Sequence, residues 1–220
     1  MKRIFLFTLL LTLSAIFYPL AARADGMQDD VNQAVSIIQR FRGMPETSIP
    51  PQVLRDAQGL AVMTVVKAGF IFSGRAGSGV VVARTGKGWS GPSAIGTGGA
   101  GFGLQIGAQV TEFVFVLNTP EAVRAFSQEG NLQLGADISV AAGPIGRTAE
   151  AAVTPLAAVY AYSLSQGLFG GISLEGTVIG ARNDANAKYY GRHVTPTEIL
   201  SGKVKAPAGA KQLQKVLAGY

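Results

Sequence analysis

Cysteine is absent from the chain, and histidine and tryptophan occur once each among its 220 residues. The absence of cysteine excludes disulfides, thiolate catalysis, cysteine-ligated metals and lipid attachment at a cysteine. Because His193 is the only histidine, a zinc motif such as H-E-x-x-H cannot form, and no G-x-S-x-G motif appears. The carboxylates are scattered along the chain. The sequence therefore predicts a protein without enzymatic activity, metal or cofactor.

Charge is also scarce, since charged residues make up 15% of the chain and hydrophobic residues 48%. This composition is too apolar for a disordered protein, and the length suits one domain. Without disulfides, the folded protein must be stabilised by its hydrophobic core.

The first 24 residues have the pattern of a secretory signal peptide. Lys2 and Arg3 precede an apolar run over 4–18. Pro19 then ends the helix that this run would form. Small residues around position 23 then fit a cleavage site after Ala24. The apolar run is shorter than the roughly 20 residues that span a bilayer. A retained membrane anchor is the alternative interpretation.

Cleavage after Ala24 would leave residues 25–220 as the mature domain, periplasmic or secreted. It would remove Lys2, Arg3 and Arg23 but no acidic residue, so the net charge would fall from +6 to +3. This charge permits a weak attraction to anionic surfaces, but it does not indicate nucleic-acid binding.

Glycine is abundant, at 29 residues, and in the middle of the chain it follows the period of a strand. Glycines at 101, 103 and 107 alternate with Phe102, Leu104 and Ile106. A strand with glycine on one face is typical of close approach by another backbone. Residues 96–101 also match G-x-G-x-x-G, but no helical pattern follows, so a dinucleotide site is not expected.

The order of patterns predicts a single α+β domain, with a glycine-rich antiparallel sheet or small barrel between N-terminal and C-terminal helices. Helical signals occupy 27–42, 49–57, 118–126 and 208–218, and a capping box lies at 195–198. Strand signals occupy 60–66, 70–72, 79–84, 100–110, 112–117 and 132–142. Segments 159–165 and 171–179 are expected to pair as a hairpin.

The first helical segment, 27–42, is amphipathic and ends in basic residues. It could pack on the core, or it could lie in a membrane interface. The residues that would contact the membrane in the second interpretation are Val35, Ile38, Arg40, Phe41 and Arg42.

Three cations, Lys67, Arg75 and Arg84, lie within or beside apolar strands, where an unpaired charge is costly. Their partners could be internal acids such as Glu112 or Asp137. A bound phosphate is the alternative, because the planar guanidinium of arginine matches phosphate geometry.

Two further residues are candidates for lipid contact. Trp89 could anchor the protein at a membrane interface, or it could be a core residue. Arg147 follows the turn Gly143-Pro-Ile-Gly146, where backbone amides could form an anion-binding nest.

Several motifs, in this order, carry a family resemblance. They are Gly74-Arg-Ala-Gly-Ser-Gly-Val-Val-Val-Ala-Arg84, Trp89-Ser-Gly-Pro-Ser93, Gly101-Phe-Gly103, Gln105-Ile-Gly-Ala-Gln-Val-Thr111 and Tyr160-Ala-Tyr-Ser163. With these motifs the chain resembles the SYLF family, also called the Ysc84 or DUF500 family, over roughly residues 30–218.

The resemblance implies a lipid-binding module, because eukaryotic members bind phosphoinositides through an amphipathic N-terminal segment and some also bind actin. This chain differs in its predicted signal peptide and in having no SH3 or FYVE companion. We therefore expect a bacterial exported member that binds anionic, phosphoinositide-like headgroups at a membrane surface and is peripherally associated with it. The alternative is a non-enzymatic module that binds another protein of the cell envelope.

Overall fold

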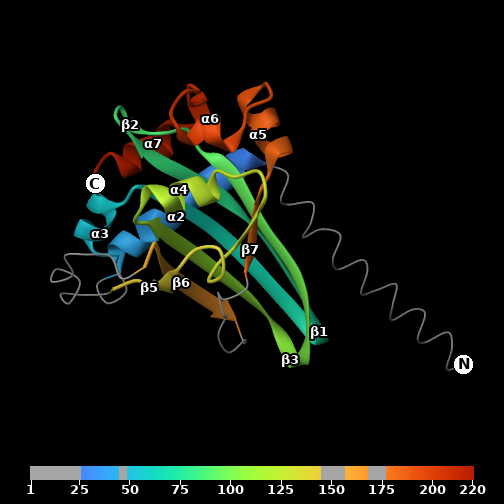
Figure 1. Ribbon diagram of the computed structural model, residues 1–220. Coiled ribbons are helices and arrows are strands. Elements are labelled where there is room, and N and C mark those ends of the chain that lie inside the picture. The colour runs from blue at the N-terminus through green and yellow to red at the C-terminus, as the bar shows by residue number, and fades with distance from the viewer. Residues whose placement is uncertain (1–25, 45–48, 145–156, 168–176) are drawn as a thin grey trace, which may run out of the picture.

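The computed structural model describes residues 26–44, 49–144, 157–167 and 177–220. The predicted signal peptide and Arg147 lie outside these residues. The described residues form one α+β domain, in which helices pack on a strongly curled sheet (Figure 1). The predicted fold class is therefore confirmed.

The helices are short apart from the first. They are α2 (Met27–Gly43), α3 (Pro51–Asp56), α4 (Pro120–Phe126), α5 (Asn183–Tyr190), α6 (Pro196–Leu200), α7 (Lys211–Leu217) and the 3₁₀ turn η3 (Ala208–Ala210). The strands are β1 (Gly59–Thr85), β2 (Gly88–Trp89), β3 (Ser93–Leu117), β4 (Asn131–Gln133), β5 (Val140–Ala142), β6 (Val159–Gly167) and β7 (Val178–Ala181).

The described strands form a seven-stranded sheet with the order β2-β1-β3-β6-β5, and β7 pairs with both β3 and β4. All of these pairs are antiparallel except β5–β6, which is parallel. The expected antiparallel sheet therefore contains one parallel pair.

Strand β1 is too long to run straight, and it doubles back on itself. A Cβ atom at Gly77 would lie 2.7 Å from the Thr64 carbonyl oxygen, and one at Gly79 would lie 2.1 Å from that of Val62. Near the ends of the strand, the Arg84 N–H donates to the Gln58 carbonyl. The two arms of β1 are therefore in contact, and the chain reverses near residue 71. Glycine permits this close approach at Gly77 and Gly79, whereas the approach predicted at 101, 103 and 107 stays a prediction.

Strand β3 follows the same reversal, because it pairs with both arms of β1. Its C-terminal part pairs with 59–70 and its N-terminal part with 72–81, and the register shifts between Phe70 and Phe72. The separate strand signals at 60–66, 70–72 and 79–84 thus belong to one continuous strand. Figure 1 shows β1 and β3 running together toward the lower right, past the helices.

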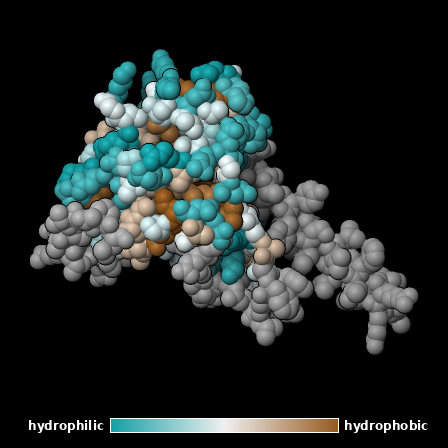
Figure 2. Space-filling model, in the orientation of Figure 1, coloured by the Kyte–Doolittle hydropathy of each residue, from teal (hydrophilic) through white to brown (hydrophobic). Residues whose placement is uncertain are grey.

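The alternation of side chains along β1 builds a hydrophobic cluster on each face of the sheet. Even-numbered residues such as Leu60 and Val62 pack with helices α2 and α7. Odd-numbered residues such as Met63 pack with Phe115 and with Phe126 of α4. In the space-filling view, hydrophilic atoms cover most of the helical half, and apolar atoms gather below α4 (Figure 2).

Two predicted helix starts are confirmed by their caps. The Thr119 hydroxyl accepts a hydrogen bond from the Ala122 N–H at the start of α4. Thr195 and Glu198 form the predicted capping box at the start of α6. Gly202 follows α6 in a left-handed conformation, with φ of 73°. These local signals are reliable because each needs only residues a few positions apart.

One strand prediction was wrong. Segment 132–142 is interrupted by a turn at Gly135, where φ is 86° and the Gln133 N–H donates to the Asp137 carboxylate. The expected hairpin of 159–165 with 171–179 stays a prediction. In the described residues, β6 pairs with β3 and β5, and β7 pairs with β3 and β4. Helix α5 was not expected. Most of segment 171–179 lies outside the described residues.

Candidate functional site

Helix α2 packs on the sheet through its apolar face, which the membrane interpretation had placed against lipid. Val35, Ile38 and Phe41 are buried, with 8%, 4% and 2% of their surface exposed. They belong to the same cluster as Leu60 and Val62 of β1. In this structure the apolar face of α2 is therefore a core face, and these side chains cannot contact lipid while the helix stays packed.

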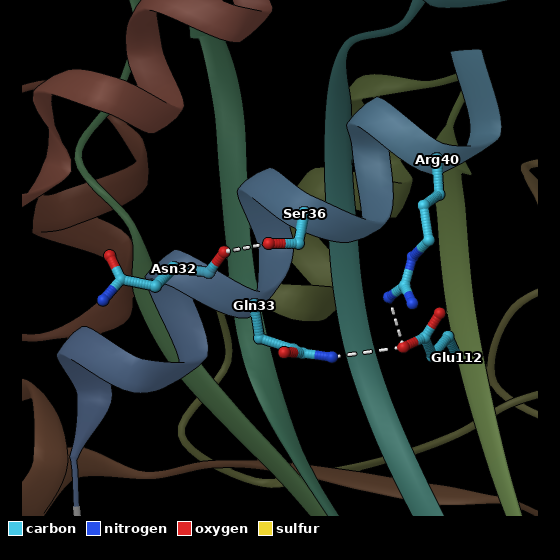
Figure 3. A network of polar contacts seen from close by, with 5 residues as sticks. All are labelled: Asn32, Gln33, Ser36, Arg40 and Glu112. Carbon is cyan, nitrogen blue, oxygen red and sulfur yellow. Dashed lines mark hydrogen bonds and ion pairs between the residues drawn. The ribbon is translucent and has the colours of Figure 1, made fainter. Parts of the chain in front are cut away.

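The polar side of α2 is joined to the sheet through Glu112 of β3. The Gln33 amide donates to Glu112 Oε1 over 3.1 Å, and the Arg40 guanidinium forms an ion pair with the same oxygen (Figure 3). One turn of the helix away, the Ser36 hydroxyl donates to the Asn32 carbonyl. Glu112, expected as a partner of the strand cations, thus binds α2.

The remaining arginine of the predicted membrane helix, Arg42, stacks on an aromatic ring. Its guanidinium carbon lies 4.8 Å from the ring centroid of Tyr220, near the C-terminus. Arg40 and Arg42 both stay partly open to solvent, since the Arg40 side chain is 41% exposed and Arg42 is also exposed. These contacts attach α2 at its C-terminal end.

An ion pair that the sequence did not indicate attaches the N-terminal part of α2. Asp30 accepts from the Ser78 hydroxyl over 2.6 Å and pairs with Arg182 over 2.8 Å. Burial raises the pKa of Asp30, while the Ser78 hydrogen bond and the Arg182 charge oppose that rise. The pair was missed because its members are 152 positions apart in the chain.

Arg84 and Trp89 have internal roles in the structure. Arg84 donates through Nε to the Ala57 carbonyl and through Nη2 to the Leu54 carbonyl, each over 3.0 Å, which satisfies the C-terminal end of α3. Its guanidinium lies 4.5 Å from the ring centroid of Trp89. Trp89 is 8% exposed and donates to the Leu217 carbonyl. This tryptophan is therefore a core residue.

Lys67 and Arg75 lie on the two arms of β1, each four positions from the reversal near residue 71. Both have odd numbers and are half-buried. Arg75 Nη1 donates to the Thr177 hydroxyl over 3.4 Å. Both side chains also have further interactions within the protein. The fold thus brings these two predicted residues to the same end of the sheet, and it places Arg84 at the other end.

Gln109 lies opposite Lys67 in the β1–β3 ladder. It is 3% exposed, yet its amide oxygen accepts no hydrogen bond in the part of the chain that the structure describes. The nearby Thr64 hydroxyl is also buried without a hydrogen bond. Unsatisfied buried polar atoms are uncommon in native proteins, so Thr64 and Gln109 mark a part of the β1–β3 ladder with incomplete hydrogen bonding.

Other kinds of site find little support among the described residues. No three potential metal ligands of the His, Cys, Asp or Glu type gather there. None of the described helices has the length and apolar character needed to cross a bilayer. A small hollow beside α2 is lined mainly by apolar side chains such as Ile49, Leu54 and Leu60, with Arg42 as its cation.

The sequence of this chain can also be compared with those of known proteins. Residues 98–220 match the family described as Ysc84, Las17-binding protein actin regulator. Protein YSC84 of Saccharomyces cerevisiae is 55% identical over 174 residues, which cover 77% of this chain and 37% of the yeast protein. The chain belongs to the Ysc84 family, as its motifs predicted.

Relatives also occur in animals. SH3 domain-containing YSC84-like protein 1 is 45% identical over 203 residues in Xenopus laevis and 42% identical over 202 residues in Homo sapiens. These matches cover 88% of this chain, and 61% and 59% of the relatives. The chain therefore spans between about two fifths and three fifths of the relatives it matches. The names of these relatives refer to Las17, actin and SH3 domains and do not denote enzymes.

Proposed function

We propose that this protein binds anionic lipid headgroups at a membrane surface after export, and that it does so without catalysing a reaction. The observation that carries the proposal is the position of Lys67 and Arg75 on the two arms of one strand reversal. Membership of a family whose eukaryotic members are expected to bind phosphoinositides supports it. The predicted signal peptide supports export.

The electrostatics of the arrangement favour a phosphate group. Two cations at one end of a sheet can both lie close to an anionic surface, and each contributes about 1 kcal/mol there. Arginine adds a fork of N–H donors that fits phosphate, whereas lysine acts as a point charge. Their existing partners within the protein would have to be exchanged for headgroup oxygens. Binding is therefore expected to weaken as salt rises.

The proposed site contains fewer residues than the site that the sequence predicted. Arg84 and Trp89 are assigned to the core by their contacts. Arg147 stays a candidate, outside the described residues. Arg40 and Arg42 are partly open to solvent and could add charge near a surface, whereas the apolar face of α2 would have to leave the core first.

Co-sedimentation with vesicles tests the proposal. The mature chain, residues 25–220, should pellet with vesicles that contain anionic phospholipid and stay in solution with neutral vesicles. The double variant Lys67→Gln/Arg75→Gln should bind anionic vesicles roughly tenfold to thirtyfold more weakly. Its control is Lys203→Gln/Lys211→Gln, which removes the same charge from exposed positions near the C-terminus. Equal, negligible pelleting with both vesicle types would refute the proposal.

A protein partner is the second candidate function, because relatives are named as Las17-binding proteins. Because the sequence predicts export of this chain, the partner proposed here is a protein of the cell envelope. Lipid-free mature protein should then retain one envelope protein at a stoichiometric level, and the retained protein should be unaffected by added anionic vesicles. Retention only in the presence of lipid would favour the first function.

A further inference from the structure

The reversal of β1 and β3 carries no charged residue. We call residues 68–74 of β1 and 100–108 of β3 the ribbon end. Phenylalanine occurs there at 70, 72 and 102, with aliphatic residues at 71, 104 and 106, and the polar residues are Ser73 and Gln105. Phe70 pairs with Ile106 and Phe72 with Phe102, so these positions meet across the two strands. The ribbon end is thus apolar and uncharged in sequence, a composition that favours contact with an apolar environment.

The ribbon end lies away from the helices that cover the rest of the sheet. Figure 1 shows the strands extending past the helices at the lower right. Ala100 and Ala108 are exposed, and Val110 beside them is 42% exposed. By contrast, Val114 and Val116, further along β3 in the helix-covered half, are fully buried. The apolar character of β3 thus continues beyond the point where the helices stop covering it.

Charges of one sign border this uncharged segment. Lys67 and Arg75 lie just outside it on the two arms of β1. No aspartate or glutamate occurs between Asp56 and Glu112 in the sequence, so neither strand carries an acidic residue up to Glu112. An apolar end with a basic border is complementary to a bilayer surface that presents anionic headgroups above hydrocarbon.

We propose that the ribbon end inserts into one leaflet of the membrane, with Lys67 and Arg75 at the level of the headgroups. This inference rests on the proposed lipid-binding function and names the part of the protein that enters the bilayer. Four residues separate each cation from the reversal near residue 71, which corresponds to about 13 Å of strand. Half the hydrocarbon thickness is about 15 Å, so the ribbon end reaches into a single leaflet.

The mechanism differs from insertion by an amphipathic helix. Helix α2 keeps its apolar face on the core, and the protein binds as a folded unit with its sheet end directed into the membrane. A ribbon that enters end-on keeps its internal strand pairs, because β1 and β3 stay paired along the register. The backbone groups that point away from the partner strand need water or headgroup oxygens, so they favour the interfacial part of the leaflet. No refolding of the domain is needed.

Fluorescent labels at single cysteines test the insertion, because the natural chain has no cysteine. Ala100→Cys in the ribbon end and Ala218→Cys after α7 are matched alanine positions, both exposed. Each variant of the mature chain is labelled with nitrobenzoxadiazole and mixed with anionic vesicles. The label at 100 should shift to shorter wavelength and be quenched by nitroxide-bearing acyl chains. The label at 218 should change little.

The outcomes separate insertion from simple binding. Pelleting with anionic vesicles while both labels stay unchanged would overturn the insertion and leave lipid binding intact. A response of the label at 218 alone would also overturn it. A shift at 100 that depends on protein concentration and occurs without vesicles would show that the ribbon end contacts a second copy of the chain instead. Failure to pellet would remove the proposed function and this inference together.

A second variant adds a charge to the ribbon end without a label. Ala108→Asp changes an exposed alanine that pairs with Ala68, on the reversal side of Lys67, so near-ultraviolet circular dichroism should show an unchanged fold. Binding to anionic vesicles should fall roughly tenfold or more, because a carboxylate is costly to place in a membrane. Its matched control is Ala218→Asp, which adds the same charge at an exposed position after α7 and should weaken binding much less. Equal binding of the two variants would contradict insertion.

Discussion

The two ends of the β1–β3 ribbon have similar composition and different surroundings. At the helix-covered end, Leu60 and Val116 are fully buried between helices and sheet. At the ribbon end, Ala100 and Ala108 are exposed, although the strands continue with apolar residues and glycine. The exposed alanines therefore contribute little to the core, in contrast to Leu60 and Val116. Substitutions at such positions of the two ends should have different consequences.

The largest difference is expected from side chains of the core. Phe115 is 1% exposed, stacks on Phe113 with ring centroids 5.5 Å apart and also contacts Phe126. Phe115→Ala should lower the free energy of unfolding by about 3–5 kcal/mol because it leaves a cavity. Val110→Ala, near the ribbon end, should cost less than about 1 kcal/mol. Urea denaturation measures both, and similar losses would show that the ribbon end is packed as tightly as the core.

Substitutions of glycine should also differ in their effect on stability, according to the space around each glycine. A Cβ at Gly79 would lie 2.1 Å from the Val62 carbonyl oxygen and 2.5 Å from the Met63 Cα, so the two arms of β1 would have to separate. Gly79→Ala should therefore destabilise the protein by about 2–4 kcal/mol. A Cβ at Gly98 would have its nearest neighbour at 4.0 Å, so Gly98→Ala should be tolerated. Thermal unfolding of both variants would show whether β1 doubles back as described.

The arginines of β1 should separate stability from binding. Arg84→Gln removes two hydrogen bonds to the end of α3 and the contact with Trp89, and it should cost about 1–3 kcal/mol of stability. Arg75→Gln should cost less than about 1 kcal/mol and should weaken binding to anionic vesicles. If Arg84→Gln lost vesicle binding at unchanged stability, our assignment of Arg84 to a structural role would be wrong.

The smallest effect concerns pH. Because burial raises the pKa of Asp30 above its usual 3.8, the folded protein holds this proton to higher pH than the unfolded chain does. The stability that Asp30 contributes is thus present below the unfolded pKa and is lost as pH rises through the folded pKa. Relative to Asp30→Asn, the wild type should lose stability as the pH rises from below 3.8 through the raised pKa of Asp30. Urea midpoints over this range would measure it, and a rising difference would mean that Arg182 dominates.

Much of the local structure could be predicted from short stretches of sequence. The first helix, the Thr119 cap and the capping box at Thr195 depend on residues within one or two turns, and all three were confirmed. The family was also predictable, because its motifs are ordered along the chain. Segment 132–142 failed because alternation alone cannot reveal that Gly135 adopts a left-handed turn.

The candidate site was less predictable, because the fate of each cation depends on distant partners. Lys67, Arg75 and Arg84 look alike in sequence, as cations within or beside apolar strands. Arg84 meets the end of α3 and Trp89, whereas Lys67 and Arg75 lie on either side of a reversal that no turn signal marked. Glu112 was a plausible partner for all three cations, but it forms its ion pair with Arg40 of α2.

By itself, the sequence determined the class of the fold, the family and the composition of the ribbon, because these follow from periodicity, capping chemistry and ordered motifs. Only the tertiary structure decided which apolar surfaces lie in the core and which cations bind to other groups within the protein. Burial and ion pairing depend on contacts between residues far apart in the chain, such as Asp30 with Arg182 and Gly79 with Val62. Local patterns carry no information about which of these distant segments will meet.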